Sequence, residues 1–379
     1  MSYESIYGRR RYWRVCCTTL LAATMILGGM FVPERAAAEA YIAMREGYKC
    51  SQCHVNKTGG GKRNDFSNAY VQTRLAQYPL GWLPPGEEGG ESAVGNMYHG
   101  RLNDYVSLGS DFRFAYSERY VPGVKNPDRD MSIRSGLLFL QMDMLPERAS
   151  LYLDQSVQGA ATAREMFLLF SALPADSYVK MGRFFLASGF RLQDDSAFVR
   201  QYPGFTYGNP DNGIEIGIEP GPFSIALWTT SIDLKRGVTA SVISRPARIG
   251  MSYNIDSTTK DKEKTVANVF GGLHLGRFTI LAELDQIVTG TVSPVTSLAS
   301  LLELDYMITK GANLKLSHDG LDPNVNVERD RVERFSLVYE PFITQFLQVG
   351  AGGRYYVGQK DNNQENRKEY FIELHGFFF

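Results

Sequence analysis

The sequence predicts an all-β fold, a 16-stranded antiparallel outer-membrane β-barrel over residues 97–379, preceded by a small helical module. Three observations predict this fold. Beyond residue 96, segments of about ten residues alternate apolar and polar side chains. Short turns alternate with longer polar loops between these segments, and the chain ends in an aromatic strand, Tyr370 to Phe379. A large soluble β-sandwich with similar alternation is the alternative.

The alternation is clearest in the first expected strand. Its side chains divide into an apolar face, Val106, Leu108, Phe112, Phe114 and Tyr116, and a polar face, Ser107, Gly109, Asp111, Arg113 and Ser117. Because neighbouring side chains of a strand point to opposite sides, we expect the apolar face towards lipid and the polar face towards the lumen. Residues 297–308 and 334–339 repeat the pattern. In the last strand, Phe379 falls one residue out of phase with the outward set.

The connections alternate in length, as they do in outer-membrane barrels. Tight turns are predicted at 146–148, 174–176, 219–222, 244–247, 275–277, 309–312 and 341–344, and longer loops at 118–130, 187–212, 255–265, 289–296, 319–329 and 357–367. Short turns are typical of the periplasmic side, so the first strand should begin there and the last strand should end there. A closed barrel of this size leaves an aqueous lumen, which the N-terminal module could enter and plug.

Residues 1–40 are expected to be a cleaved signal peptide. Arginines between Arg9 and Arg14 precede an apolar run over 15–32, and alanines at 36–38 offer a cleavage site. Cleavage after Ala40 removes five Lys/Arg and three Asp/Glu from totals of 40 and 41, which leaves a formal charge of −3. That charge argues against nucleic acid as a partner.

Cys50-Ser-Gln-Cys53-His54 is a C-x-x-C-H sequence, the attachment signature of a covalent c-type haem. Each thiol can add to one haem vinyl group, and the histidine then becomes the proximal iron ligand. The other two cysteines, Cys16 and Cys17, fall in the signal peptide. The alternatives are a local disulfide or half of a zinc site, and zinc would need two further ligands at motif spacing. We therefore expect one haem c in a module over residues 41–78, and a Pro/Gly-rich linker over 79–96.

A second axial ligand, His or Met, is expected on the haem iron. His99 and Met97 lie where the linker meets the barrel, so the chain could fold back there, and they are the leading candidates. Met44, a lumen residue or an open coordination position are the alternatives. Ordinary apolar packing would explain both methionines equally well.

Two further patterns were candidates for binding sites. Residues 59–63, Gly-Gly-Gly-Lys-Arg, lack the spacing and the Ser/Thr of a phosphate-binding loop, so we expect a flexible loop beside the haem. Glu283, Asp285, Glu303 and Asp305 should face the lumen from neighbouring strands. Carboxylates bind hard cations, so these acids are a candidate patch for ferrous iron or another divalent metal, with polar lumen lining as the alternative. The few histidines have no Ser or Cys at informative spacing, which argues against a hydrolase.

In its order of parts, the chain resembles the fused monohaem cytochrome c–porin family of outer-membrane electron conduits, which includes the outer-membrane iron oxidases of iron-oxidising bacteria. The resemblance in sequence covers residues 43–54, with Gly47 three residues before the first cysteine, and the stretch from Phe66 to Tyr70. The chain departs from the family in two places. Family members tend to have a Phe-Gly pair where this chain has Phe66-Ser67, and a proline-containing segment where this chain has the three glycines at 59–61.

The resemblance implies an outer-membrane protein that passes single electrons between an extracellular metal or other redox substrate and a periplasmic c-type cytochrome or other electron carrier. Extracellular Fe(II) oxidation is the candidate enzyme activity. The alternative is a porin or metal-uptake channel in which the haem module acts as plug or redox gate. A third hypothesis is a barrel that only anchors a periplasmic cytochrome.

Overall fold

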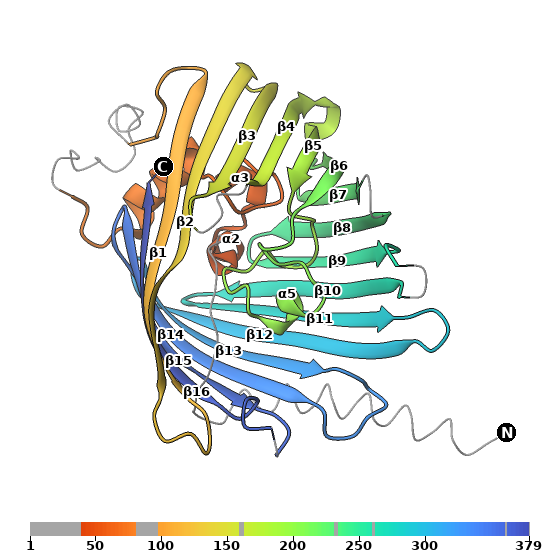
Figure 1. Cartoon of the computed structure of the whole chain (residues 1–379). Coiled ribbons are helices and arrows are strands. Elements are labelled where there is room, and N and C mark those ends of the chain that lie inside the picture. Colours follow the sequence, from red (N-terminus) through yellow and green to blue (C-terminus); the bar gives the residue numbers. More distant parts are fainter. Residues whose placement is uncertain are drawn as a thin grey trace.

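The computed structural model describes residues 39–80, 98–158, 163–230, 234–259, 262–360 and 362–378. Sixteen antiparallel strands close into one barrel, and a small group of helices lies inside it (Figure 1). The predicted fold class is therefore confirmed. No helix of the described residues is long and apolar enough to cross a membrane.

The strands follow one another round the barrel in chain order, and each pairs with the next. Their bounds are β1 (Val106–Tyr120), β2 (Asp128–Leu145), β3 (Ala149–Ser156), β4 (Ala163–Leu173), β5 (Ser177–Phe184), β6 (Asp211–Ile218), β7 (Phe223–Thr230), β8 (Lys235–Ser244), β9 (Ala247–Asp256), β10 (Lys264–Leu275), β11 (Phe278–Thr289), β12 (Val295–Thr309), β13 (Ala312–Asp322), β14 (Val332–Thr344), β15 (Leu347–Val357) and β16 (Lys368–Phe378). The first and last strands close the ring, from Ser110 opposite Phe378 to Tyr120 opposite Lys368.

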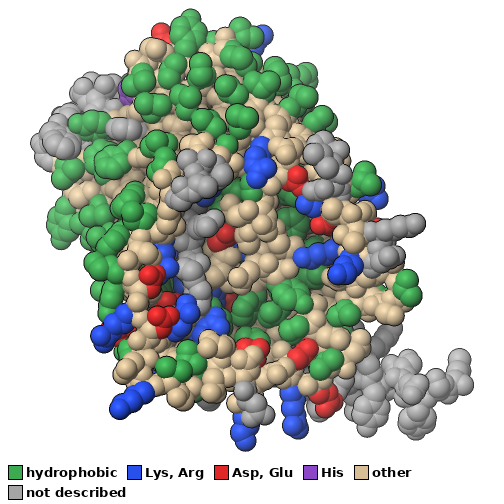
Figure 2. Space-filling model, viewed as in Figure 1, with side chains coloured by type: hydrophobic (Ala, Val, Ile, Leu, Met, Phe, Trp, Pro, Cys, Tyr) green, Lys and Arg blue, Asp and Glu red, His purple; other side chains and the backbone are tan. Residues whose placement is uncertain are grey.

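The predicted alternation is confirmed along the strands. In β1, Leu108, Phe112 and Tyr116 are exposed on the outside, whereas Ser107 and Arg113 are buried in the lumen. Figure 2 shows apolar side chains gathered over the upper part and one edge of the barrel wall, with charged side chains towards the lower part. A wall that is apolar outside and polar inside is the reverse of a soluble protein, and it is typical of a membrane barrel.

Six of the seven predicted tight turns lie where they were expected, and the seventh is displaced. The prediction placed a turn at 341–344, but β14 continues through Pro341 to Thr344, so the turn falls at residues 345–346. Pro341 lies opposite Ala312 at the end of the β13–β14 pairing, where a missing backbone N–H weakens the ladder little. We call the two ends of the barrel the short-turn end and the long-loop end.

The N-terminal module enters the lumen from the short-turn end. It consists of α2 (Ala40–Glu46), α3 (Cys50–Cys53), α4 (Asp65–Tyr70) and a π-helical turn η2 (Val71–Leu75). Gly47 ends α2 in the left-handed conformation, and the Asn64 side chain caps α4 by accepting a hydrogen bond from the Ser67 amide. Gln77 N donates to Phe342 O, so the module is tied to the wall near the short-turn end.

The connection between β5 and β6, residues 185–210, folds into the lumen from the opposite side; we call it the inner loop. It carries the short helix α5 (Phe198–Gln201). Trp228 Nε1 donates to Ala187 O at 2.9 Å, and Phe190 N donates to Glu283 Oε2 at 2.8 Å. Arg334 pairs with Asp194 at 2.8 Å. These bonds fix the loop against β7, β11 and β14.

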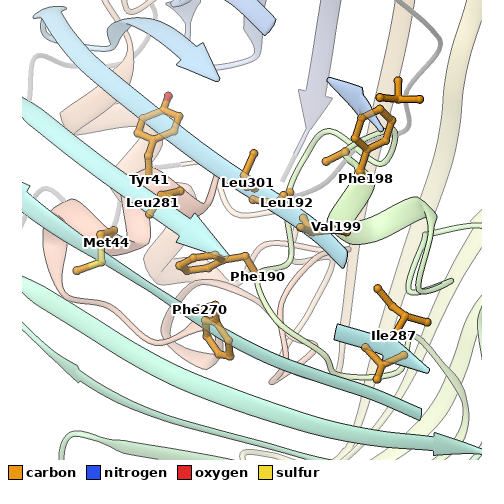
Figure 3. Close-up of a cluster of buried hydrophobic side chains, with 14 of the residues drawn as sticks. Tyr41, Met44, Phe190, Leu192, Phe198, Val199, Phe270, Leu281, Ile287 and Leu301 are labelled. Atoms are coloured by element: carbon orange, nitrogen blue, oxygen red, sulfur yellow. The ribbon is translucent and has the colours of Figure 1, made fainter. Parts of the chain in front are cut away.

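An apolar cluster inside the lumen joins the module to the inner loop (Figure 3). Tyr41 and Met44 of α2 pack with Phe190 of the inner loop and with Phe270 and Leu281 of the wall. All five side chains are buried. Burial of large apolar side chains stabilises each by about 1.5–3 kcal/mol. Packed protein therefore fills this part of the lumen.

Candidate cofactor site between the module and the inner loop

The C-x-x-C-H motif lines a cavity in the lumen. Cys50, Cys53 and His54 face it from the module, Phe139 from β2, and Phe190 from the inner loop. The local structure brings the three motif residues together, because α3 carries both cysteines on one short turn and His54 is the residue at which the helix ends. The cavity is thus bounded by the module on the short-turn side and by the inner loop on the long-loop side.

His54 is buried, and its Nδ1 atom has no hydrogen-bond partner among the described residues. Burial, together with the nearby Arg63 guanidinium, lowers the pKa of His54 to about 4. The imidazole is therefore neutral at neutral pH, which is the form that binds metals. An antiparallel backbone bridge between His54 and Arg63 fixes the backbone position of His54.

Both thiols are free and half-buried. Burial, together with the neighbouring Cys50, raises the pKa of Cys53 to about 11. Two free thiols and a neutral imidazole on the residue after the second thiol are the groups that a c-type haem requires, so the residues present fit it.

The glycine turn 59–61 packs directly against this site, and this differs from the flexible loop that we expected. All three glycines have positive φ, +95°, +80° and +65°. A Cβ at Gly59 would lie 3.3 Å from Cys50 Sγ, and a Cβ at Gly60 would lie 3.3 Å from Tyr207 Cε1. A Cβ at Gly61 would overlap the Tyr152 hydroxyl. The turn therefore needs glycine for conformation and for close approach.

The candidates for the second axial ligand are dispersed. His99 lies outside the cavity, is exposed, and accepts a hydrogen bond from Arg101 N at 3.2 Å. Met97 lies outside the described residues. Met44 belongs to the apolar cluster. Neither His99 nor Met44 lines the cavity, so of the alternatives a lumen residue or an open coordination position remains.

The structure brings another histidine, His375 of β16, into the cavity. Its Nε2 lies 2.7 Å from Asp111 Oδ2, and its Nδ1 lies 3.0 Å from Gln348 Oε1, so both ring nitrogens already have partners. Sequence reasoning did not select His375. The alternation of side chains along β16 would have placed His375 in the lumen. The pairing of β1 with β16, which sets Arg113 opposite His375, would have placed it near Asp111.

The four acids of the predicted cation patch face the lumen but do not form one cluster. In the β11–β12 register Glu283 lies opposite Leu301, whereas Glu303 lies opposite Leu281, so the two pairs are staggered. Glu283 accepts the Phe190 amide, and Glu303 lines a separate polar cavity with Lys315. Asp285 and Asp305 are buried on the same strands. Within the described residues, no group of three or more His, Cys, Asp or Glu side chains converges as metal ligands would.

Comparison with known proteins places the fold among porins. No protein-family model matches the sequence, and no curated protein matches it. An anion-selective porin from Comamonas acidovorans is similar in structure, with a TM-score of 0.59 at 10% identity, covering 72% of this chain and 99% of that one. OprB of Pseudomonas putida has a TM-score of 0.58 at 10% identity, covering 73% of this chain and 95% of that one. OmpT of Vibrio cholerae has a TM-score of 0.57 at 11% identity, covering 72% of this chain and 97% of that one. At such identities the likeness establishes the porin fold alone.

Proposed function

We propose that the chain is an outer-membrane electron conduit in which a covalent haem c is held inside the barrel by Cys50, Cys53 and His54. The observation that carries the proposal is the position of the motif, in a lumen cavity with the module on one side and the inner loop on the other. A haem outside the barrel could serve only one face of the membrane. A haem in this cavity lies between both faces.

The outer surface of the wall supports location in a membrane. Leu138 is 52% exposed, Ile249 65% and Tyr370 56%, and all three lie on strands. An apolar band of this kind is stable only when lipid covers it. Because short turns belong to the periplasmic side of such barrels, the short-turn end with the module faces the periplasm.

The residues round the cavity suit a single redox centre. When bound, the haem supplies reversible one-electron transfer at its iron. The two thiols hold the group in place, and His54 presents a neutral ring nitrogen to it. Phe190 and Phe139 give the site apolar surface, and Arg164, Arg191 and Arg248 place positive charge round it. Burial and charge round such a centre are among the means by which a protein sets its potential.

A hollow at the short-turn end suits an acidic electron-carrier protein. Exposed Phe66 lies in it beside Arg74, Arg245 and Lys310, and the Arg245 side chain is 64% exposed. The acid in this group, Glu46, is already 3.5 Å from Arg245. A basic surface with an aromatic side chain steers an acidic partner and then packs against it. We therefore propose a periplasmic c-type cytochrome or other carrier of acidic surface as the partner on this side.

At the long-loop end, the proposed partner is an extracellular metal or other redox substrate, with Fe(II) as the first candidate. This part rests on the family resemblance. The acids Glu283 and Glu303 are engaged by the inner loop and by a mixed-charge cavity, so the lumen offers no preformed iron cage in its described part. The substrate would therefore give up its electron near the outer mouth.

A channel is the second candidate, and the porin likeness favours it. A polar cavity lies between the inner loop and the wall; Arg113, Arg354, Glu303 and Glu369 line it, and no described residue of the module does. In this alternative the haem module is a plug or redox gate, and small solutes or metal ions pass beside it.

One reconstitution separates the two candidates. Haem-loaded protein is placed in sealed vesicles, and the haem spectrum is followed while Fe(II) or an impermeant oxidant is added outside. A conduit changes its spectrum without solute flux, and a Cys50→Ser/Cys53→Ser protein, which cannot attach haem, passes no electrons to a trapped acceptor. Flux of small solutes together with a haem that external reagents never reach would overturn the conduit and support the channel.

A further inference from the structure

Three arginines surround one aromatic ring beside the cofactor cavity. The guanidinium carbons of Arg164, Arg191 and Arg200 lie 5.7, 5.7 and 5.6 Å from the centre of the Tyr207 ring. Phe185 packs edge-on against the same ring at 5.0 Å. Tyr207 and Arg200 are each 1% exposed, and Arg164 and Arg191 are 7% and 9% exposed. Burying three cations together is costly unless anions compensate them.

The compensation inside the protein is incomplete. Arg164 makes a bidentate pair with Asp154, at 3.1 and 2.7 Å. Arg200 comes only within 4.0 Å of Asp195, whose oxygens accept the Tyr207 amide instead. Arg191 donates to the Phe185 carbonyl at 3.2 Å and forms no ion pair with the described residues.

Five donor atoms in this group have no hydrogen-bond partner among the described residues, although they are buried. They are Arg164 Nη1, Arg191 Nη1, Arg200 Nε and Nη2, and the Tyr207 hydroxyl. Arginine donors are arranged to bind carboxylates and other oxyanions, and buried donors of this kind are rarely left unused. Burial lowers the pKa of Arg200, and the charge of Arg191 lowers it further, which a bound anion would reverse.

The group borders the haem motif. A Cβ at Gly59 would lie 3.3 Å from Cys50 Sγ and 3.8 Å from Arg191 Cγ, so that arginine and that cysteine flank the same glycine. Arg164 and Arg191 both line the cavity with His54. Glu165 and Glu283 are further acids near these arginines. Glu165 Oε1 accepts from Asn56 at 2.7 Å and from the Phe185 amide at 3.0 Å, whereas Glu165 Oε2 has no hydrogen-bond partner among the described residues.

We infer that Arg191, Arg200 and Tyr207 form a buried oxyanion site in the inner loop, with a carboxylate or similar small anion as its ligand. Two sources have this chemistry. A haem propionate would fill the site from within the molecule, and that form rests on the proposed function. A free oxyanion from the medium would fill it independently of haem.

The test uses the full chain with and without haem. Inorganic phosphate and acetate are titrated by calorimetry into the haem-free Cys50→Ser/Cys53→Ser protein and into the haem-loaded protein. If the anions bind the haem-free protein but not the haem-loaded protein, a haem propionate is the resident ligand. If they bind both proteins equally, the ligand is a free oxyanion. Arg200→Gln and Tyr207→Phe should each weaken anion binding at least tenfold. Arg129→Gln, on the exposed end of β2, is the matched control and should change nothing.

A second readout does not depend on anion titration. In haem-loaded protein, Arg200→Gln should lower the reduction potential and shift the propionate vibrations in resonance Raman spectra. Heat-dependent gel mobility shows whether each variant still folds as a barrel, and Tyr207→Phe keeps the packing while removing only the hydroxyl. The inference is overturned if neither form binds anions and neither variant moves the potential or the vibrations. Failure to attach haem would instead refute the proposed function, and the haem-free arm would still decide the anion site.

Discussion

Replacing Gly61 by alanine should release the module from the lumen. Gly61 has a φ of +65°, and an added Cβ would overlap the Tyr152 hydroxyl. Left-handed backbone costs a residue with a Cβ roughly 1–2 kcal/mol. The clash also forces Tyr152 away from the Lys62 amide, which donates to its hydroxyl at 2.9 Å. An unpaired buried amide costs about 1–3 kcal/mol, so the total is roughly 2–5 kcal/mol.

Gly276→Ala is the matched control. Gly276 has a φ of +63°, nearly that of Gly61, but nothing lies within 4 Å of its Cβ position. It should therefore show only the backbone cost of roughly 1–2 kcal/mol. The difference of about 1–3 kcal/mol between the two variants corresponds to a shift of roughly 5-fold to 150-fold in the equilibrium constant of module docking.

The assay is trypsin cleavage within residues 41–78 of folded barrels in detergent, together with single-channel conductance in planar bilayers. Gly61→Ala should be cleaved faster and conduct more than Gly276→Ala. Tyr152→Phe removes the clashing oxygen, so Gly61→Ala should add only its backbone cost in that background, and the two changes should be non-additive. If Gly61→Ala and Gly276→Ala behave alike, the docked position of the module is refuted.

Three further outcomes are expected. His54→Met should leave the haem attached but change its absorption bands and potential, since the proximal ligand changes; an unaltered spectrum would exclude His54 as ligand. Arg74→Glu with Lys310→Glu should slow electron transfer between the haem and an acidic carrier about tenfold at low salt and have little effect at high salt, measured by stopped-flow absorbance; equal rates of the variant and the unaltered protein at all salts would refute the docking surface. Glu219→Gln should weaken the contact that Ser51 Oγ makes with its carboxylate by about 1 kcal/mol, seen as a small increase in trypsin cleavage of the module; unchanged cleavage would show that this contact does not hold the module.

The barrel could be predicted from the sequence because a two-residue period is a local property. The faces of Leu108 and Arg113 can be assigned from their neighbours along the strand. The number of strands follows from the alternation of short turns and longer loops, which is also visible in the sequence. The displaced turn shows the limit of local reasoning. Pro341 signals a turn in isolation, but its place at the end of a paired ladder lets the strand continue.

The site could be predicted only in part. The haem motif is a contiguous pattern, so Cys50, Cys53 and His54 were identifiable as soon as they were read. The residues that enclose them come from distant segments, such as Phe190 in a loop that turns inward and His375 on the last strand. No periodicity marks a loop that enters a lumen, and its arginines resemble ordinary polar loop residues until their partners are placed.

Conduit and channel make opposite demands on the same contacts. A conduit must keep the module docked, because the cavity round His54 exists only while Phe190 and the glycine turn close it. A channel must let the module move, because the packed side chains of α2 and the inner loop fill the lumen. Releasing the module with Gly61→Ala therefore has opposite consequences. It abolishes electron transfer across the membrane if the docked haem is the path, and it increases transport if the module is a gate.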